Sequence, residues 1–221
     1  MKKLFGSLLL CFLLLAVQAQ DKKPPFWDDI QAFKKKDSIQ MPAKHQILFV
    51  GSSSFTKWTD VQDYFPGYPI LNRGFGGSTL LDVIRYREDV IFKYDPKQIL
   101  IYCGENDFAY ADTLSPETAV ARFTELFGYI RARYPKVPLA YVSMKPSASR
   151  AKFMPRYVIA NKAIADFLHK KRKAVFIDVY PAMLDADGNP IGDIFVEDHL
   201  HMNAKGYQIW QKIIAPYLLK K

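Results

Sequence analysis

Four short polar segments of the chain contain the side chains that nucleophilic chemistry requires. A serine hydroxyl on a tight turn can attack a carbonyl carbon when a histidine takes its proton and an aspartate orients that histidine. Asp198 and His201 are three residues apart, so both side chains can turn to one place. These residue types predict a hydrolase. The four segments are Gly51-Ser52-Ser53-Ser54, Asn72-Arg73-Gly74-Phe75-Gly76-Gly77-Ser78-Thr79, Gly104-Glu105-Asn106-Asp107 and Asp198-His199-Leu200-His201.

The same segments offer donors for the negative charge that develops on an attacked carbonyl oxygen. The backbone N–H groups of Ser53 and Gly77 and the side-chain amide of Asn106 are suitable donors. Glycine at position 77 lets the backbone approach a substrate closely. We therefore expect an oxyanion hole beside the nucleophile.

Each segment alone has a simpler interpretation. Three serines after a strand often form a helix cap, and Asp198 with His201 could cap a helix as well. The glycine-rich loop 72–79 does not match the G-x-G-x-x-G dinucleotide pattern. His199 and His201 could bind a metal ion, but no third ligand has suitable spacing. The sequence therefore predicts neither a metal nor an organic cofactor.

The elements that must position these segments alternate along the chain. Five short runs rich in Ile, Val, Leu, Phe or Tyr predict strands buried on both faces, and amphipathic stretches between them predict helices. This alternation predicts a parallel sheet covered by helices, with ligands beyond the carboxyl ends of the strands. Ser115 and Asn203 are expected N-caps. The predicted strands are 47–50, 69–71, 98–103, 139–144 and 174–179, and the predicted helices are 58–64, 80–93, 116–134, 155–171 and 204–219.

The first nineteen residues have the pattern of a secretory signal peptide. Lys2 and Lys3 precede a nearly unbroken apolar run, and the small residue Ala19 ends the cleavage region. The run is shorter than the roughly 20 residues of a membrane span. Cleavage would leave 202 of 221 residues, lower the formal charge from +9 to +7 and place the protein in the periplasm or outside the cell, without a membrane span. We divide the chain into a signal peptide (1–19), a lead-in with a first helix (20–46) and one domain (47–221).

Composition excludes several other classes of protein. Hydrophobic residues make up 49% and charged residues 24%, which is an ordinary globular balance and argues against a disordered or coiled-coil chain. Only two cysteines are present, and Cys11 falls in the leader, so Cys103 is expected to be a small core residue. The basic run 170–173 suits the end of a helix rather than a nucleic-acid site. No nucleic-acid partner is expected, and nothing in the sequence specifies an oligomeric state.

In order, the four segments resemble the signature blocks of the SGNH hydrolases, also called the GDSL esterase/lipase family. The chain is most similar to the branch that resembles the catalytic subunits of platelet-activating-factor acetylhydrolase, over about 47–218. The resemblance implies a three-layer α/β/α sandwich with a five-stranded parallel sheet of flavodoxin-like topology. The segments match the family blocks G-D-S, N-x-G-x-G-G, G-x-N-D and D-x-x-H.

The resemblance implies a role for each matching residue. Ser53 would be the nucleophile, His201 the base and Asp198 the acid of a triad. The backbone N–H groups of Ser53 and Gly77 and the Asn106 amide would form the oxyanion hole. One position departs from the pattern, because Ser52 replaces the aspartate before the nucleophile. This departure leaves Ser52 or Ser54 open as the residue that carries the reactive hydroxyl.

The implied activity is that of an exported serine esterase acting through an acyl-enzyme. No long lid or extended apolar loop of a lipase is evident, so we expect small acyl groups, such as acetyl, removed from a small-molecule or carbohydrate ester. The alternative is a non-catalytic glycan-binding or scaffold protein that keeps the fold. The expected substrate contacts are Trp58, Arg73, Glu105 and Tyr110.

Overall fold

An all-parallel sheet of five strands lies at the centre of the protein, in a computed structural model that describes residues 23–220. The strands are β1 (Ile47–Gly51), β2 (Ile70–Gly74), β3 (Gln98–Tyr102), β4 (Leu139–Val142) and β5 (Ala174–Ile177). Their order is β2-β1-β3-β4-β5, which is the flavodoxin-like order of a doubly wound sheet. The central strands β1 and β3 are buried along their whole length. The predicted α/β fold is confirmed, while the predicted signal peptide lies outside the described residues.

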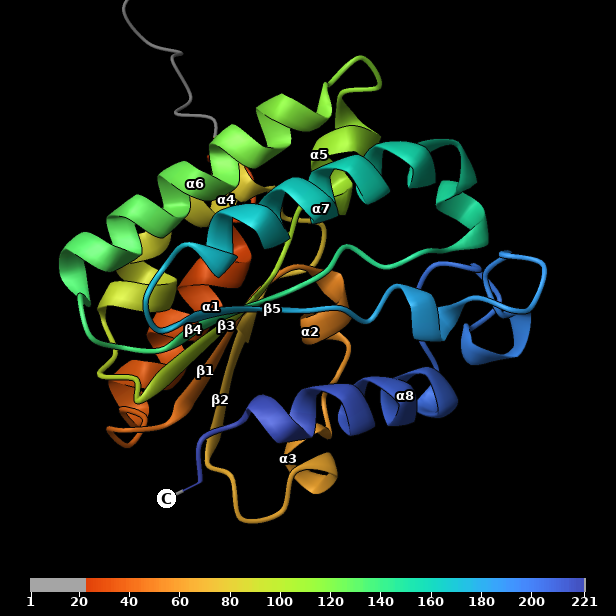
Figure 1. Cartoon of the computed structure of the whole chain (residues 1–221). Helices are drawn as coiled ribbons and strands as arrows, with labels where there is room; N and C mark the ends of the chain where they lie inside the picture. Colours follow the sequence, from red (N-terminus) through yellow and green to blue (C-terminus); the bar gives the residue numbers. More distant parts are fainter. Residues whose placement is uncertain (1–22, 221) are drawn as a thin grey trace, which may run out of the picture.

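Helices cover both faces of the sheet and complete a three-layer sandwich (Figure 1). The α-helices are α1 (Trp27–Ile39), α2 (Ser53–Thr56), α3 (Val61–Tyr64), α4 (Leu80–Arg85), α5 (Glu105–Tyr110), α6 (Pro116–Arg133), α7 (Met154–His169) and α8 (Ala204–Ile214). Within residues 23–220, the segments of 3-10 or π geometry are η1 (Glu88–Phe92), η2 (Ala148–Phe153), η3 (Pro181–Met183), η4 (Gly192–Ile194) and η5 (Ala215–Tyr217).

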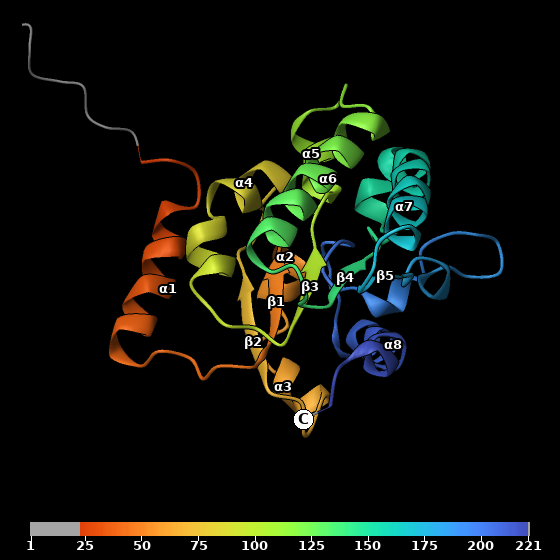
Figure 2. The ribbon, with the colours of Figure 1, turned by 60° about the vertical axis from the view of Figure 1, so that its left-hand side comes forward.

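Each face of the sheet has its own hydrophobic core. The helices α1, α4, α5, α6 and α7 contribute buried residues to one core, and we call this side the α6 face. The helices α2, α3 and α8 contribute to the other core, on what we call the α8 face. Figure 2 shows α1 beside the β2 edge of the sheet and α8 on the opposite side from α6. Cys103 is buried in the core of the α6 face, as expected, and burial raises the pKa of its thiol.

The expected helix caps are present. The Ser115 hydroxyl accepts a hydrogen bond from the Thr118 N–H at the start of α6. The Asn203 side chain accepts bonds from the N–H groups of Lys205 and Gly206 at the start of α8. Because Asn203 follows Asp198-x-x-His201 closely, this cap also fixes where the preceding loop meets α8.

Some predicted boundaries are wrong. The helix expected at 80–93 is interrupted, because Tyr86 leaves the helical conformation and a π-helical turn, η1, follows. The Tyr86 hydroxyl donates instead to the Pro25 carbonyl oxygen, which links this bend to the start of α1. The helix expected at 58–64 is reduced to α3, and α8 ends at Ile214. The short helices α2 and α5 were not predicted. Within residues 23–220, none of the helices combines the length and apolar character needed to cross a bilayer.

A buried ion cluster attaches α1 to the sheet. The Asp37 carboxylate accepts bonds from the Arg73 guanidinium at 2.5 Å and the Tyr94 hydroxyl at 2.7 Å, and Lys93 lies 3.1 Å away. Burial raises the pKa of Asp37, but the hydrogen bonds and charges of these neighbours together lower it below the ordinary value. Arg73 lies in β2 with its side chain buried in this cluster, a placement that the expected contact with substrate did not anticipate.

Removing one partner of this cluster is expected to destabilise the fold. The Asp37→Ala substitution leaves Arg73 buried without its carboxylate and should lower the free energy of unfolding by about 3 kcal/mol. Urea unfolding monitored by circular dichroism measures this change. The control is Asp166→Ala, which removes an exposed i,i+4 partner of Lys162 and should change nothing measurable. An Asp37→Ala protein with the wild-type unfolding midpoint would refute the assigned role of the cluster.

Candidate active site

The site is built around the sharp turn that ends β1. Gly51 has φ of 137°, and a Cβ atom at this position would lie 1.9 Å from the Tyr102 carbonyl oxygen of the neighbouring strand β3. Only glycine fits there, for reasons of both conformation and space. The Ser52 N–H then donates to the same Tyr102 oxygen at 2.9 Å, and the chain enters α2. The three serines are therefore presented at the carboxyl edge of the sheet.

The three serines differ in accessibility. Ser52 is 3% exposed and Ser54 is 1% exposed, whereas Ser53 is half-buried at the first position of α2. A nucleophile must reach substrate from solvent, and of these three hydroxyls only that of Ser53 meets this condition. The accessibility therefore favours Ser53 over the two alternatives that the sequence left open.

Asn106 joins three strand ends. Its Nδ2 atom donates to the Ser52 hydroxyl at 2.7 Å and to the Ser78 carbonyl oxygen at 3.2 Å. Ser78 in turn donates from its hydroxyl to the Gly51 carbonyl oxygen at 3.1 Å. These bonds hold the ends of β1 and β3 and the loop after β2 together. The Asn106 amide is thus fixed next to the serine turn, in contact with the residue that departs from the family pattern.

The loop after β2 places Gly77 beside an aromatic side chain. Gly77 has φ of 88°, in the left-handed region that favours glycine. A Cβ atom here would lie 3.0 Å from the Tyr110 hydroxyl oxygen. Tyr110 is 65% exposed at the end of α5, so its predicted contact with substrate remains a prediction.

Asp198 and His201 form the expected pair. Asp198 Oδ2 lies 2.5 Å from His201 Nδ1, and Asp198 Oδ1 accepts bonds from the N–H groups of Leu200 and His201. Burial raises the pKa of Asp198, but these hydrogen bonds outweigh it and lower the pKa to about 2. The carboxylate is therefore ionised at neutral pH, as a group that orients and stabilises an imidazolium must be.

The Asp198–His201 loop meets the serine turn through α8. The Tyr207 hydroxyl donates to the Ser54 carbonyl oxygen at 2.9 Å, which joins α8 to α2. Among the hydrogen bonds of residues 23–220, none connects Ser53 directly to His201. On the other side, the Ser149 N–H and hydroxyl both donate to the His199 carbonyl oxygen. His199 itself has φ of 51°, so these bonds hold a strained turn just before His201.

The side chains of two further expected substrate contacts, Trp58 and Glu105, lie in other contacts of the fold. Trp58 is fully buried and stacks on Tyr207 with ring centroids 4.7 Å apart, in the core of the α8 face. Glu105 is 7% exposed, and its carboxylate pairs with the Lys145 ammonium at 3.3 Å, which is itself 1% exposed. Aromatic and charged residues near a polar loop carry no sign in the sequence of which way they face.

Asp107 anchors the Gly104–Asp107 segment, a role that the sequence did not reveal. Its carboxylate accepts bonds from Arg122 of α6 at 2.7 Å and from the Leu80 N–H at the start of α4 at 2.9 Å. Burial raises the pKa of Asp107, against the effect of these two donors. The residue next to Asn106 thus anchors α5 to two other helices. Its place in the G-x-N-D block was the only signal in the sequence.

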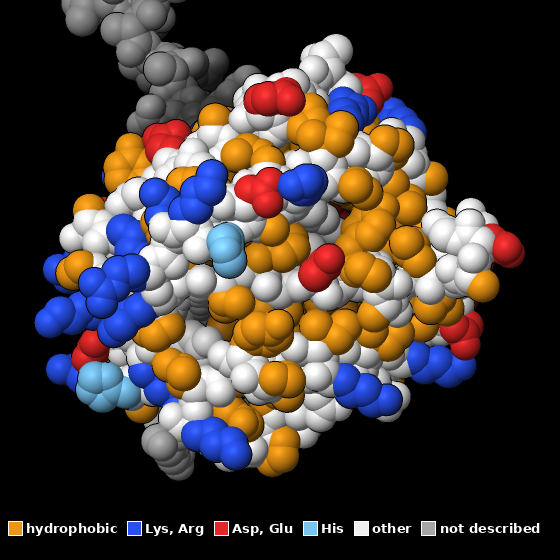
Figure 3. Space-filling view, in the orientation of Figure 1, with side chains coloured by type: hydrophobic (Ala, Val, Ile, Leu, Met, Phe, Trp, Pro, Cys, Tyr) orange, Lys and Arg blue, Asp and Glu red, His pale blue; other side chains and the backbone are white. Residues whose placement is uncertain are grey.

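The positively charged side chains are concentrated away from the carboxyl edge of the sheet, where the serine turn lies. Figure 3 shows Lys and Arg side chains concentrated on the side where α6 and α7 end. The exposed residues there include Arg133 and the basic run 170–173. This side corresponds to the amino ends of the strands, so the net charge of the chain does not mark the candidate site.

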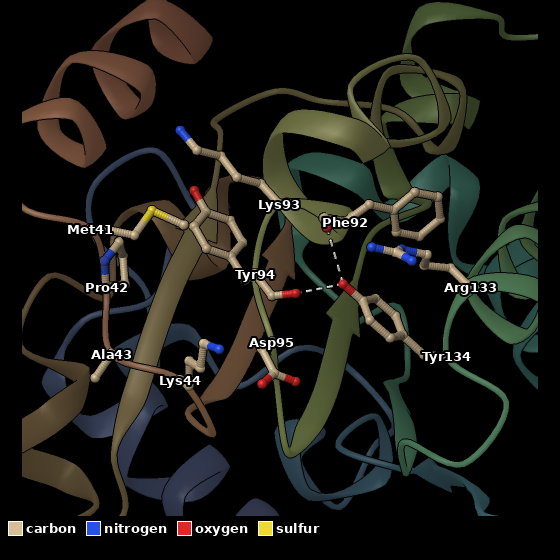
Figure 4. Close-up of a pocket in the computed structure, with 10 residues that line it drawn as sticks. All are labelled: Met41, Pro42, Ala43, Lys44, Phe92, Lys93, Tyr94, Asp95, Arg133 and Tyr134. Atoms are coloured by element: carbon tan, nitrogen blue, oxygen red, sulfur yellow. Dashed lines mark hydrogen bonds between the residues drawn. The ribbon is translucent and has the colours of Figure 1, made fainter.

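A hollow of about 410 Å³ also lies at the amino ends of the strands (Figure 4). Its walls come from the segments before β1 and β3 and from the end of α6. The Tyr134 hydroxyl donates to the carbonyl oxygens of Phe92 and Tyr94 across it. Parallel sheets bind ligands at the opposite, carboxyl edge, where Ser53 lies, so we do not assign the activity to this hollow. The lining residues are Met41, Pro42, Ala43, Lys44, Phe92, Lys93, Tyr94, Asp95, Arg133 and Tyr134.

Comparison with known families agrees with the fold and with the four segments. The family model of the GDSL-like lipase/acylhydrolase family matches residues 49–209. The chain therefore belongs to the GDSL-like lipase/acylhydrolase family. Its activity class is that of a carboxylic ester hydrolase. Among curated proteins, none matches the chain in sequence.

Several solved structures share the fold at low sequence identity. A Streptococcus pneumonia protein whose name refers to platelet activating factor is 18% identical, with a TM-score of 0.76 over 96% of this chain and 99% of that one. A GDSL-like lipase from Bacteroides thetaiotaomicron is 18% identical, with a TM-score of 0.70 over 85% and 96%. A family 3 carbohydrate esterase from Talaromyces cellulolyticus is 16% identical, with a TM-score of 0.61 over 78% and 95%.

The low pKa of Asp198 predicts how its contribution to stability depends on pH. A folded-state pKa of about 2 lies below the unfolded value of about 3.9, so the pairing stabilises the fold above about pH 4 and is lost as pH falls toward 2. The difference in melting temperature between wild type and Asp198→Asn should therefore shrink across this range in thermal unfolding experiments. Glu197→Gln, an exposed carboxylate in the same loop, is the control. A difference that stays constant from pH 6 to pH 2.5 would contradict the assignment.

The contact between Ser52 and Asn106 predicts a defect in turnover rather than in binding. In Ser52→Ala the Asn106 amide loses the acceptor at 2.7 Å that orients it. For an amide that is expected to stabilise charge in the transition state, this loss should lower kcat about tenfold and leave KM nearly unchanged. Ser52→Asp supplies a carboxylate acceptor at the same position and should recover most of the rate. Steady-state kinetics on p-nitrophenyl acetate measure both. A Ser52→Ala enzyme with wild-type kcat would show that this contact does not matter.

Proposed function

We propose that the protein is an exported serine esterase that removes short acyl groups, acetyl foremost, from carbohydrate esters. Ser53 is the nucleophile, His201 the general base and Asp198 the residue that orients it. The observation that carries the proposal is the 2.5 Å contact between Asp198 and His201, together with the accessible position of Ser53 at the carboxyl end of β1.

In the first half of the reaction, Ser53 Oγ attacks the ester carbonyl carbon while His201 Nε2 takes the hydroxyl proton. Asp198 holds Nδ1 of the imidazole, which fixes the tautomer and stabilises the imidazolium that forms. His201 then gives the proton to the leaving alcohol, and the acyl group stays on Ser53. In the second half, water takes the place of the alcohol and the same proton transfers release the acid.

Three donors receive the charge on the carbonyl oxygen. They are the backbone N–H groups of Ser53 and Gly77 and the Nδ2 group of Asn106. In the resting arrangement, both N–H groups of Asn106 Nδ2 are occupied, one by the Ser52 hydroxyl and one by the Ser78 carbonyl oxygen. These bonds hold the amide beside the serine turn, and the longer one, to Ser78, is exchanged for the bond to the oxyanion when substrate binds.

Two observations support the proposal that the substrates are carbohydrate esters with small acyl groups. Solved structures with this fold include family 3 carbohydrate esterases from Talaromyces cellulolyticus and Clostridium thermocellum. The longest segment at the carboxyl edge, residues 178–203 between β5 and α8, contains the short 3-10 turns η3 and η4, and within residues 23–220 this segment has no long apolar helix of the kind that lipases place over insoluble substrates. Export is supported by the sequence pattern of residues 1–19.

The proposal is tested by hydrolysis of p-nitrophenyl acetate and of acetylated xylan. Wild type should release p-nitrophenol and acetate, and Ser53→Ala should lose the activity by about 10⁴-fold or more. Asn106→Ala should lower kcat by about 10²–10³-fold, since one of three oxyanion donors is removed.

Ser38→Ala is the matched control, because the exposed Ser38 hydroxyl bonds only within α1. Equal rates for wild type and Ser53→Ala would refute the assigned nucleophile. Activity confined to long-chain lipid esters would refute the assigned substrate class. Retained binding of glycans without hydrolysis of any ester would favour the non-catalytic alternative.

A further inference from the structure

An aromatic side chain from the lead-in segment reaches the oxyanion loop. A methyl group placed on Gly77 would lie 3.6 Å from Phe26 Cε1 and 3.8 Å from Phe26 Cζ, in addition to 3.0 Å from the Tyr110 hydroxyl oxygen. Phe26 comes from the start of α1 and Tyr110 from the end of α5. Phe26 and Tyr110 are 84 positions apart in the sequence. Both nevertheless border Gly77, at the place where a side chain of residue 77 would lie.

Several contacts hold Phe26 in this place. Its ring meets the Phe75 ring edge-on, with centroids 5.4 Å apart, and Phe75 packs in the same way on Tyr86. The Tyr86 hydroxyl donates to the Pro25 carbonyl oxygen at 2.7 Å. The Asp37 cluster fixes the rest of α1 to β2. The chain is therefore held both before Phe26, at Pro25, and after it, at Asp37.

The backbone at Phe26 is strained. Its φ of 65° is in the left-handed region, which a bulky aromatic residue rarely adopts, and no side chain caps the helix that follows. Strain of this kind persists where the surrounding structure imposes it, and it is common at functional sites. At position 26, the left-handed backbone conformation directs the Phe26 ring toward the loop that contains Gly77.

The position of Phe26 and Tyr110 relative to the sheet indicates which part of the substrate these two side chains would contact. His201 must return its proton to the leaving alcohol, so the alcohol lies toward the Asp198–His201 loop, which leads into α8 and the α8 face. Phe26 packs against the core of the α6 face instead. The carbonyl oxygen faces the Gly77 N–H, and the acyl group and the alcohol leave the carbonyl carbon in different directions. The acyl group therefore extends away from the Asp198–His201 loop, on the side where Phe26 and Tyr110 border Gly77.

We propose that Phe26 and Tyr110 form the end wall of the acyl pocket and restrict the enzyme to acyl groups close to acetyl in size. This inference rests on the proposed esterase function and adds its specificity determinant. Because the Phe26 ring and the Tyr110 hydroxyl occupy the space beside Gly77, a longer acyl chain that extends on this side meets them before its carbonyl oxygen reaches the oxyanion donors.

The test compares kcat/KM for p-nitrophenyl acetate, butyrate and hexanoate. Wild type should prefer acetate. In Phe26→Ala and Tyr110→Ala, the ratio of hexanoate to acetate should rise by about tenfold or more, within the range that one or two methylene groups produce in a hydrophobic pocket. Tyr110→Ala removes a side chain that is 65% exposed, so the substitution leaves the core intact. Phe26→Leu keeps a packed apolar residue and should give a smaller rise.

Trp27→Ala is the matched control, because Trp27 is the next aromatic residue of the same segment and is 37% exposed. It should leave the acyl-length ratio unchanged. If wild type hydrolyses acetate through Ser53 but the ratio stays at the wild-type value in Phe26→Ala, Phe26→Leu and Tyr110→Ala, the inference is wrong and the proposed function stands. If wild type hydrolyses none of the three esters, both are wrong.

Discussion

The whole site depends on the close approach of Gly51 to the Tyr102 carbonyl oxygen. A Cβ atom at position 51 would be 1.9 Å from that oxygen, so the chain can make this turn only as glycine. The turn ends β1 one residue before Ser52 and starts α2 at Ser53. The Gly51 carbonyl oxygen in turn accepts bonds from the Phe75 N–H and the Ser78 hydroxyl. One backbone position thereby joins the ends of β1, β2 and β3, and the segments that contain Ser53, Gly77 and Asn106 start from these ends.

The sheet also divides the chemistry between its two faces. The Asp198–His201 pair directly precedes α8, while Phe26 packs on the core of the α6 face and Asp107 bonds to Arg122 of α6. The serine turn lies between them, at the edge that both faces share. The proposed substrate orientation, with the alcohol toward α8 and the acyl group toward α1, follows from this division. It would give α1, which precedes the sheet in sequence, a role in specificity, while the proposed acid–base pair comes from the end of the chain.

Sequence reasoning succeeded where a local pattern is sufficient. Apolar runs predicted all five strands within a few residues, and Ser115 and Asn203 were identified as caps because capping is a local hydrogen bond. It failed where tertiary contacts decide. Arg73 and Trp58 are near the polar loops in sequence. The Arg73 side chain nevertheless pairs with Asp37 in the buried ion cluster, and the Trp58 side chain packs in the core of the α8 face. The position of Phe26 depends on a chain of contacts through Phe75 and Tyr86, which no spacing in the sequence encodes.

The central claim is that Ser53, activated by His201, is the nucleophile. The most direct measurement is labelling with a fluorophosphonate, which reacts with activated serines, followed by mass spectrometry of the peptide that contains residues 51–57. The account predicts one label per protein, on Ser53, and its loss in His201→Ala. A label on Ser52 or Ser54, or labelling of Ser53 that does not depend on His201, would contradict it.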